Sequence, residues 1–90
     1  NKGVLYIKKR NYNNAIKQFR KILSIRPNDA TAYYNLACIY SLQNKKSTAC
    51  RYFTKAINSG FKKWRLIKND SDLNNIKTQK CYKKYKKELQ

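Results

Sequence analysis

Few residues of this 90-residue chain could take part in catalysis. It contains no histidine, so the commonest general base and metal ligand of proteins is missing. Asp70 and Asp72 are close in sequence, but acidic residues just before a short apolar stretch are typical of helix capping. Cys38 would need a neighbouring base to act as a nucleophile, and none is evident. Because a glycine-rich phosphate loop is also absent, the sequence predicts a protein that is not an enzyme and needs no cofactor or metal.

The charge of the chain favours a binding function instead. It has 22 lysine and arginine residues against 4 aspartate and glutamate residues, for a net charge of +18. A genome rich in A/T codons would supply many lysines without any function behind them, but this bias does not explain the scarcity of acids. A strongly basic surface therefore points to an acidic partner.

The cysteine and hydropathy patterns suggest a compartment. Cys38, Cys50 and Cys81 are odd in number and form no CxxC pair, so we expect three reduced, half-buried thiols and neither a disulfide nor a zinc site. Reduced thiols favour a reducing compartment, and the cytoplasm is the expected location. No apolar run approaches the roughly 20 residues of a membrane span. The chain shows no signal peptide and does not begin with methionine, which suggests a domain from a longer protein.

An internal repeat organises the first two thirds of the chain. Three positions return 34 residues later with unchanged spacing: Tyr6, Ala15 and Phe19 recur as Tyr40, Ala49 and Phe53. A fixed period between about 20 and 50 residues is typical of stacked helical units. Apolar side chains at three- and four-residue spacing predict two helices in each unit. The small alanines would let the two backbones approach closely.

Capping and stop residues predict where these helices begin and end. In the first unit we expect a helix to about residue 9, and a second over about 13–25 that Pro27 stops. In the second unit, Asp29 is expected to cap a helix over 30–42, and Asn44 to end it in the left-handed conformation. The last helix of this unit should start with a cap at Ser47 or Thr48 and end at Gly60.

The period fails after Gly60, but the tail is still predicted to be helical, in three pieces. Each piece has apolar anchors: Trp64 and Ile67, then Leu73 and Ile76, then Tyr82, Tyr85 and Leu89. Asp70 or Ser71 is expected to cap the second piece, and Thr78 the third. Terminal units of stacked repeats are atypical because they cover an exposed end, so we expect the tail to be a capping segment.

This pattern resembles the tetratricopeptide repeat (TPR), whose signature places an aromatic residue, Leu, Gly and Tyr on the first helix and Ala, Phe and Pro after it. The second unit matches it with Tyr33, Leu36, Ala37, Tyr40, Ala49 and Phe53, and the first with Gly3, Tyr6, Ala15, Phe19 and Pro27. The resemblance implies an all-α fold, a right-handed α-solenoid of antiparallel helix pairs. The single domain 1–90 would comprise repeat 1 (1–29), repeat 2 (30–60) and a degenerate helical capping segment (61–90). The tail is similar to the segment that often follows the last repeat of bacterial members.

The resemblance also implies a protein–protein interaction scaffold, in which the first helices of successive repeats line a concave groove that holds a peptide. The groove positions fall on Val4, Ile7, Lys8, Thr31, Tyr34, Asn35, Cys38, Ser41, Leu42, Arg65 and Lys68. Asn35 would hydrogen-bond the peptide backbone, and the basic residues would favour an acidic ligand. The alternative for Tyr34 and Leu42 is that they pack against the next helix.

The sequence leaves partners other than proteins possible. Lysines interleaved with aromatic residues, around Trp64 and again around Tyr82 and Tyr85, are a pattern that binds nucleic acid or another polyanion. Helical phase favours the simpler arrangement, with aromatic rings buried beneath a solvated lysine face. We therefore expect a protein partner first, nucleic acid second and a membrane surface third. The first unit begins partway into its first helix, and this truncated N-terminal edge would also allow self-association.

Overall fold

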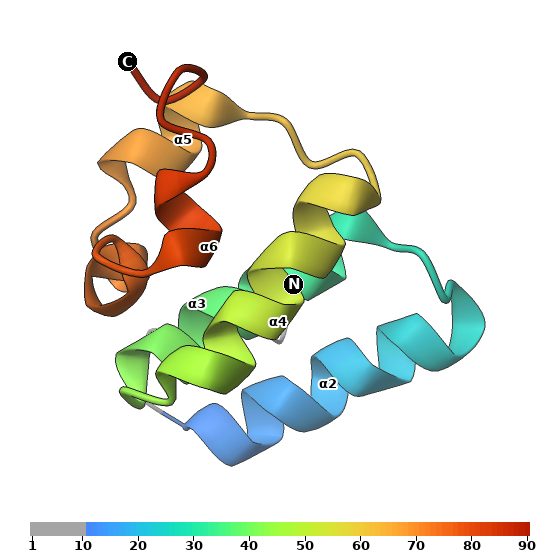
Figure 1. Ribbon diagram of the computed structural model, residues 1–90. Helices are drawn as coiled ribbons and strands as arrows, with labels where there is room; N and C mark the ends of the chain where they lie inside the picture. Colours follow the sequence, from blue (N-terminus) through green and yellow to red (C-terminus); the bar gives the residue numbers. More distant parts are fainter. Residues whose placement is uncertain (1–10) are drawn as a thin grey trace.

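The computed structural model describes residues 11–90, and the regular structure within this range is helical, without a strand (Figure 1). The elements in chain order are α2 (Tyr12–Ile25), α3 (Ala30–Leu42), α4 (Lys46–Asn58), α5 (Trp64–Asn69), the 3-10 helix η1 (Ser71–Ile76) and α6 (Lys80–Lys83). The all-α class predicted from the sequence is confirmed. The helix expected before residue 10 lies outside the described residues. None of the helices in 11–90 has the length and hydropathy of a membrane span.

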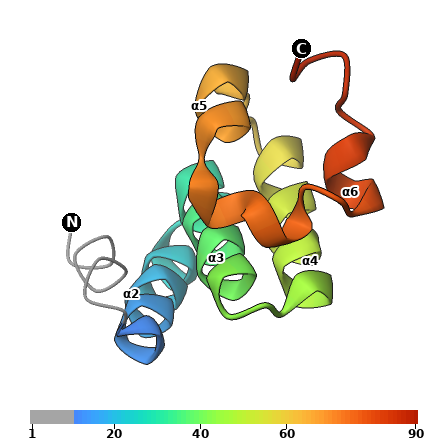
Figure 2. The ribbon, with the colours of Figure 1, turned by 90° about the vertical axis from the view of Figure 1, so that its left-hand side faces the viewer.

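Helix α3 lies at the centre of the described structure. It packs against α2 and α4, and η1 crosses over α3 and α4 (Figure 2). The helix carries no charged residue, and side chains around most of its circumference are buried, among them Leu36, Ala37 and Ile39. A helix that is apolar on most of its surface is stable in water only when neighbours cover those sides. The tail after Gly60 is therefore part of the core.

The recurring positions of the repeat are core positions. Ala15 of α2 and Ala49 of α4 are fully buried, and Phe19 and Phe53 lie beside them in the same cluster. The 34-residue return thus reflects packing. A larger side chain at either alanine would overpack the contact, at a cost of about 1–3 kcal/mol.

Most of the predicted boundaries are confirmed. The carboxylate of Asp29 accepts a hydrogen bond from the backbone N–H of Ala32 at 2.9 Å and caps α3. Asn44 ends α3 with a φ of 58°, and Gly60 follows α4 with a φ of 106°. In both places the left-handed backbone suits the residue type that the sequence provides.

Two predicted caps were wrong. Helix α4 begins at Lys46, before Ser47 and Thr48, because the tight turn at Asn44 lets the N–H of Lys45 bond directly to the carbonyl oxygen of Tyr40 at 2.8 Å. The last helix is preceded by Gln79, without a side-chain cap, so Thr78 does not cap it. This helix ends at Lys83, and turns continue to Leu89.

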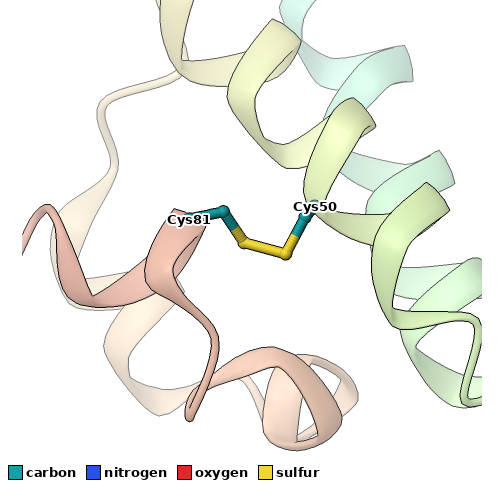
Figure 3. Close-up of a disulfide and its surroundings, with 2 residues drawn as sticks. All are labelled: Cys50 and Cys81. Carbon is teal, nitrogen blue, oxygen red and sulfur yellow. A yellow bond between two sulfur atoms is a disulfide. The ribbon is translucent and has the colours of Figure 1, made fainter.

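The expectation of three reduced thiols was also wrong. Cys50 of α4 and Cys81 of α6 form a disulfide, with their Cα atoms 5.7 Å apart (Figure 3). The two cysteines are 31 positions apart in sequence, and only the packing of α6 on α4 brings them together. Cys38, the third cysteine of the chain, is free and buried. The ground for expecting a reducing compartment is thereby removed.

Replacing Cys50 and Cys81 together by serine is expected to lower the free energy of unfolding by about 3–4 kcal/mol, because the bond restricts a long loop of the unfolded chain. Chemical denaturation without reductant measures this difference. The matched control is the unsubstituted protein with a phosphine reductant, which should lose the same stability while the serine variant does not respond. Equal stability of the oxidised and reduced protein would contradict this prediction.

Candidate functional site

Two of the predicted groove residues, Tyr34 and Cys38, lie beneath the tail. The ring of Tyr34 stacks on Phe61 with the centroids 4.1 Å apart, and its hydroxyl donates a hydrogen bond to Asp70 Oδ2 at 2.5 Å. The thiol of Cys38 donates to the same oxygen at 3.7 Å. Both side chains are buried. Tyr34 therefore adopts the alternative arrangement, in which it packs against the following segment.

The tail is fastened to this side of α3 at a second point. The side-chain amide of Asn75 in η1 donates to the carbonyl oxygen of Ser41 at 2.7 Å. Ser41 is fully buried, and so are Leu73 and Ile76 of η1. The tail side of α3 is therefore closed by a packed apolar contact with hydrogen bonds at both ends.

Asp70 has the capping role predicted for it. Its Oδ1 accepts from the backbone N–H of Asp72 at 3.0 Å, which caps η1, while its Oδ2 receives Tyr34 and Cys38. Burial raises the pKa of the Tyr34 hydroxyl, and the nearby Cys38 and Asp70 raise it further. Burial likewise raises the pKa of the Cys38 thiol, with added contributions from the charges of Asp70 and Asp72. Both groups therefore stay protonated and act as donors to Asp70.

The same residues form the cluster within 11–90 that could hold a metal ion. Single ligand atoms of Cys38, Asp70 and Asp72 lie within 4.8 Å of one another. Both oxygens of Asp70 already accept hydrogen bonds from protein groups, and the raised pKa of Cys38 opposes the thiolate that a metal would bind. Burial, and then the charge of Asp70, also raises the pKa of Asp72. Capping and packing account for this cluster.

Thr31 and Asn35 lie next to Cys38 on the same face of α3, where this face borders α2. They line a hollow of about 300 Å³ together with Phe19, Ile22, Arg26, Asp29 and Ala32. Thr31 is exposed and Asn35 is half-buried, so both offer polar groups to the hollow. Arg26 forms an ion pair with Asp29, with an N–O distance of 3.6 Å. We call this feature the α2–α3 hollow.

The remaining groove residues do not join this hollow. Arg65 and Lys68 of α5 are exposed and line a separate hollow beside the C-terminal residues. Leu42 is half-buried at the end of α3. Val4, Ile7 and Lys8 lie outside the described residues. The predicted set is thus divided between the α2–α3 hollow, the contact under the tail and the surface of α5.

Sequence reasoning missed the contribution of α2 to the hollow. It placed the first helices of the repeats and two tail residues in the groove, whereas Ile22 and Arg26 belong to a second helix and the turn after it. The sequence pattern held no signal for them, because only the packing of α2 on α3 brings Ile22 and Arg26 beside Thr31 and Asn35.

Replacing Tyr34 by phenylalanine is expected to lower the free energy of unfolding by about 1–3 kcal/mol, because Asp70 then loses a donor in a partly buried site. Tyr33→Phe is the matched control, since its hydroxyl donates to the carbonyl oxygen of Pro27 at the exposed surface. Removal of the Tyr33 hydroxyl should lower the free energy of unfolding by about 0.5 kcal/mol. Urea denaturation of both variants measures the difference, and equal losses would count against the contact with Asp70.

Cys38 is expected to resist alkylation in the folded protein, because its thiol is buried and burial raises its pKa. Treatment with iodoacetamide at about pH 8, followed by mass spectrometry of the intact chain, should show no adduct. Denaturation without reductant should then expose one reactive thiol, and reduction all three. Rapid labelling of the native protein would show that the tail does not protect Cys38.

Comparison with known proteins places the chain in a family. A TPR repeat model matches residues 3–44, and a tetratricopeptide repeat model matches residues 30–59. The chain is similar to a chloroplastic protein of Arabidopsis thaliana, with 28% identity over 83 residues. The match covers 89% of this chain but 25% of that protein, so the chain spans about a quarter of its relative. No solved structure gives a significant match. The two successive repeat matches, which together span residues 3–59, show that the chain belongs to the tetratricopeptide repeat family, whose repeats generally mediate protein–protein interaction.

Proposed function

We propose that this chain is a non-enzymatic interaction module that holds a segment of a partner protein, acidic in character, in the α2–α3 hollow. The observation that carries the proposal is the position of Thr31 and Asn35. They are groove residues of α3 that the tail leaves uncovered, and they line a hollow with apolar and polar walls. Tyr34 and Cys38 are covered by the tail and are left out of the proposed site.

The chemistry of the hollow suits an extended peptide. Phe19 and Ile22 offer an apolar floor for a side chain. The amide of Asn35 can both donate and accept, so it can pair with the N–H and C=O of a peptide backbone. Arg26 lies at the rim with its side chain 75% exposed, and beside its ion pair with Asp29 its guanidinium has further N–H groups that can bind a carboxylate of the ligand.

The distribution of acids supports an acidic ligand. Asp29 and Asp70 are engaged as helix caps, and Asp72 is half-buried. Glu88 is thus the acidic residue that is exposed, among 22 basic residues in the whole chain. The resulting positive field attracts acidic segments and speeds their encounter with the protein.

The packing of the aromatic residues disfavours the nucleic-acid alternative. Tyr82 and Tyr85 pack on Phe53 with ring centroids 5.8 and 6.2 Å apart, and Trp64 packs on Tyr85 at 5.3 Å. Their faces are used inside the tail, whereas single-stranded nucleic acid needs exposed faces on which bases can stack.

Selection of peptides from a random display library on the immobilised protein tests the proposal. We expect enrichment of aspartate and glutamate. Asn35→Ala should weaken the best peptide about fivefold to tenfold, the effect of one or two hydrogen bonds. Asn14→Ala is the control, because this exposed asparagine lies near the start of α2, away from the hollow.

Two results would contradict this assignment. Unchanged affinity in Asn35→Ala would remove the α2–α3 hollow as the site. Selected peptides without an excess of acids would remove the acidic character of the partner. Arg26→Gln separates the two, since it should reduce the preference for acids while leaving neutral peptides bound.

A further inference from the structure

A second hollow, of about 460 Å³, lies in the tail and is lined by four lysines that come from different elements. Lys68 belongs to α5, Lys77 follows η1, Lys83 ends α6, and Lys86 lies in the turns that follow. Tyr82 and Leu89 supply an apolar floor. We call this feature the lysine pocket.

The lysine pocket concentrates positive charge that no described side chain of its lining balances, since Gln90, which completes the lining, has a neutral amide. Among the described residues, its lining includes no acidic side chain. Glu88 lines the neighbouring hollow beside Arg65 instead. The ammonium of Lys77 donates to the carbonyl oxygen of Lys68 at 3.0 Å, which fixes one charge at the rim. Cations held around one hollow repel each other, and an anion placed among them relieves this repulsion.

The floor of the pocket is suited to an apolar side chain. Leu89 is buried, and Tyr82 is half-buried with its ring against Phe53. Burial raises the pKa of the Tyr82 hydroxyl, so this group stays neutral and can donate a hydrogen bond. The pocket thus joins an apolar base to a cationic rim.

We propose that the lysine pocket is a second binding site of this chain, and that it takes a protein segment in which glutamate or aspartate flanks a large apolar side chain. The proposal shares with the proposed function only the idea of an acidic protein ligand, and it concerns a different surface. A peptide fits better than nucleic acid, because the tail aromatics pack on one another and on Phe53, and these contacts occupy ring faces on which bases would stack. Lysines act here as point charges for single carboxylates.

The probe is a fluorescein-labelled synthetic peptide in which glutamates flank one phenylalanine, and fluorescence anisotropy measures its affinity for the full chain. Lys83→Gln with Lys86→Gln should weaken binding about tenfold, since two charge-assisted contacts are lost. Lys17→Gln with Lys21→Gln removes the same charge from exposed positions of α2 and should change affinity less than about twofold. Each of these four lysines is exposed, so the substitutions should leave the fold intact.

Further measurements make the outcomes distinct. Asn35→Ala should leave this binding unchanged, so failure of the α2–α3 hollow and failure of the lysine pocket can be told apart. If Lys17→Gln with Lys21→Gln weakened peptide binding as much as Lys83→Gln with Lys86→Gln, the proposal would be overturned, because affinity would then depend on the overall charge. Tighter binding of a thymidine oligonucleotide, lost in the Lys83 and Lys86 variant, would also overturn it. A peptide with alanine for phenylalanine should bind more weakly, and equal affinity would refute the apolar floor.

Discussion

A helix without a charged side chain has to be covered over most of its surface, and the structure of the rest of the chain depends on covering α3. Helices α2 and α4 cover two sides, as neighbours in a repeat array do. The third side is covered by η1, whose Leu73 and Ile76 are fully buried. In a chain this small, which buries a modest share of its surface, such a cover is a large part of the core.

The carboxylate of Asp70 joins this cover to α3. One of its oxygens caps η1 and the other receives the hydroxyl of Tyr34 and the thiol of Cys38. A carboxylate with these donors is satisfied in a partly buried place, where an unpaired one would be costly. Closing the tail side of α3 also decides where ligands can bind. What stays open is the α2–α3 hollow and the basic surface of the tail itself.

Periodicity and local backbone chemistry made much of the fold predictable. Phe19 and Phe53 were recognisable as core residues because a 34-residue return needs a structural cause, and Asp29 was recognisable as a cap because its side chain acts on the next turn. The start of α4 was not predictable in the same way. It depends on the turn at Asn44, which lets the helix begin at Lys46 without a capping side chain.

The sequence by itself determined the helices α2, α3 and α4, the register of the repeat and the sign of the charge, because these properties arise from side chains a few positions apart, from the 34-residue period or from composition. Only the tertiary structure decided that Cys50 meets Cys81, that Tyr34 meets Asp70, and that Lys68 and Lys83 share one hollow. These contacts depend on how the tail folds back over α3 and α4 once its period is lost. The spacing of apolar residues within a repeat indicates which helices pack on each other. The position of the tail depends instead on the apolar surface of α3 and α4 that the other helices leave uncovered, and no local sequence pattern shows this surface.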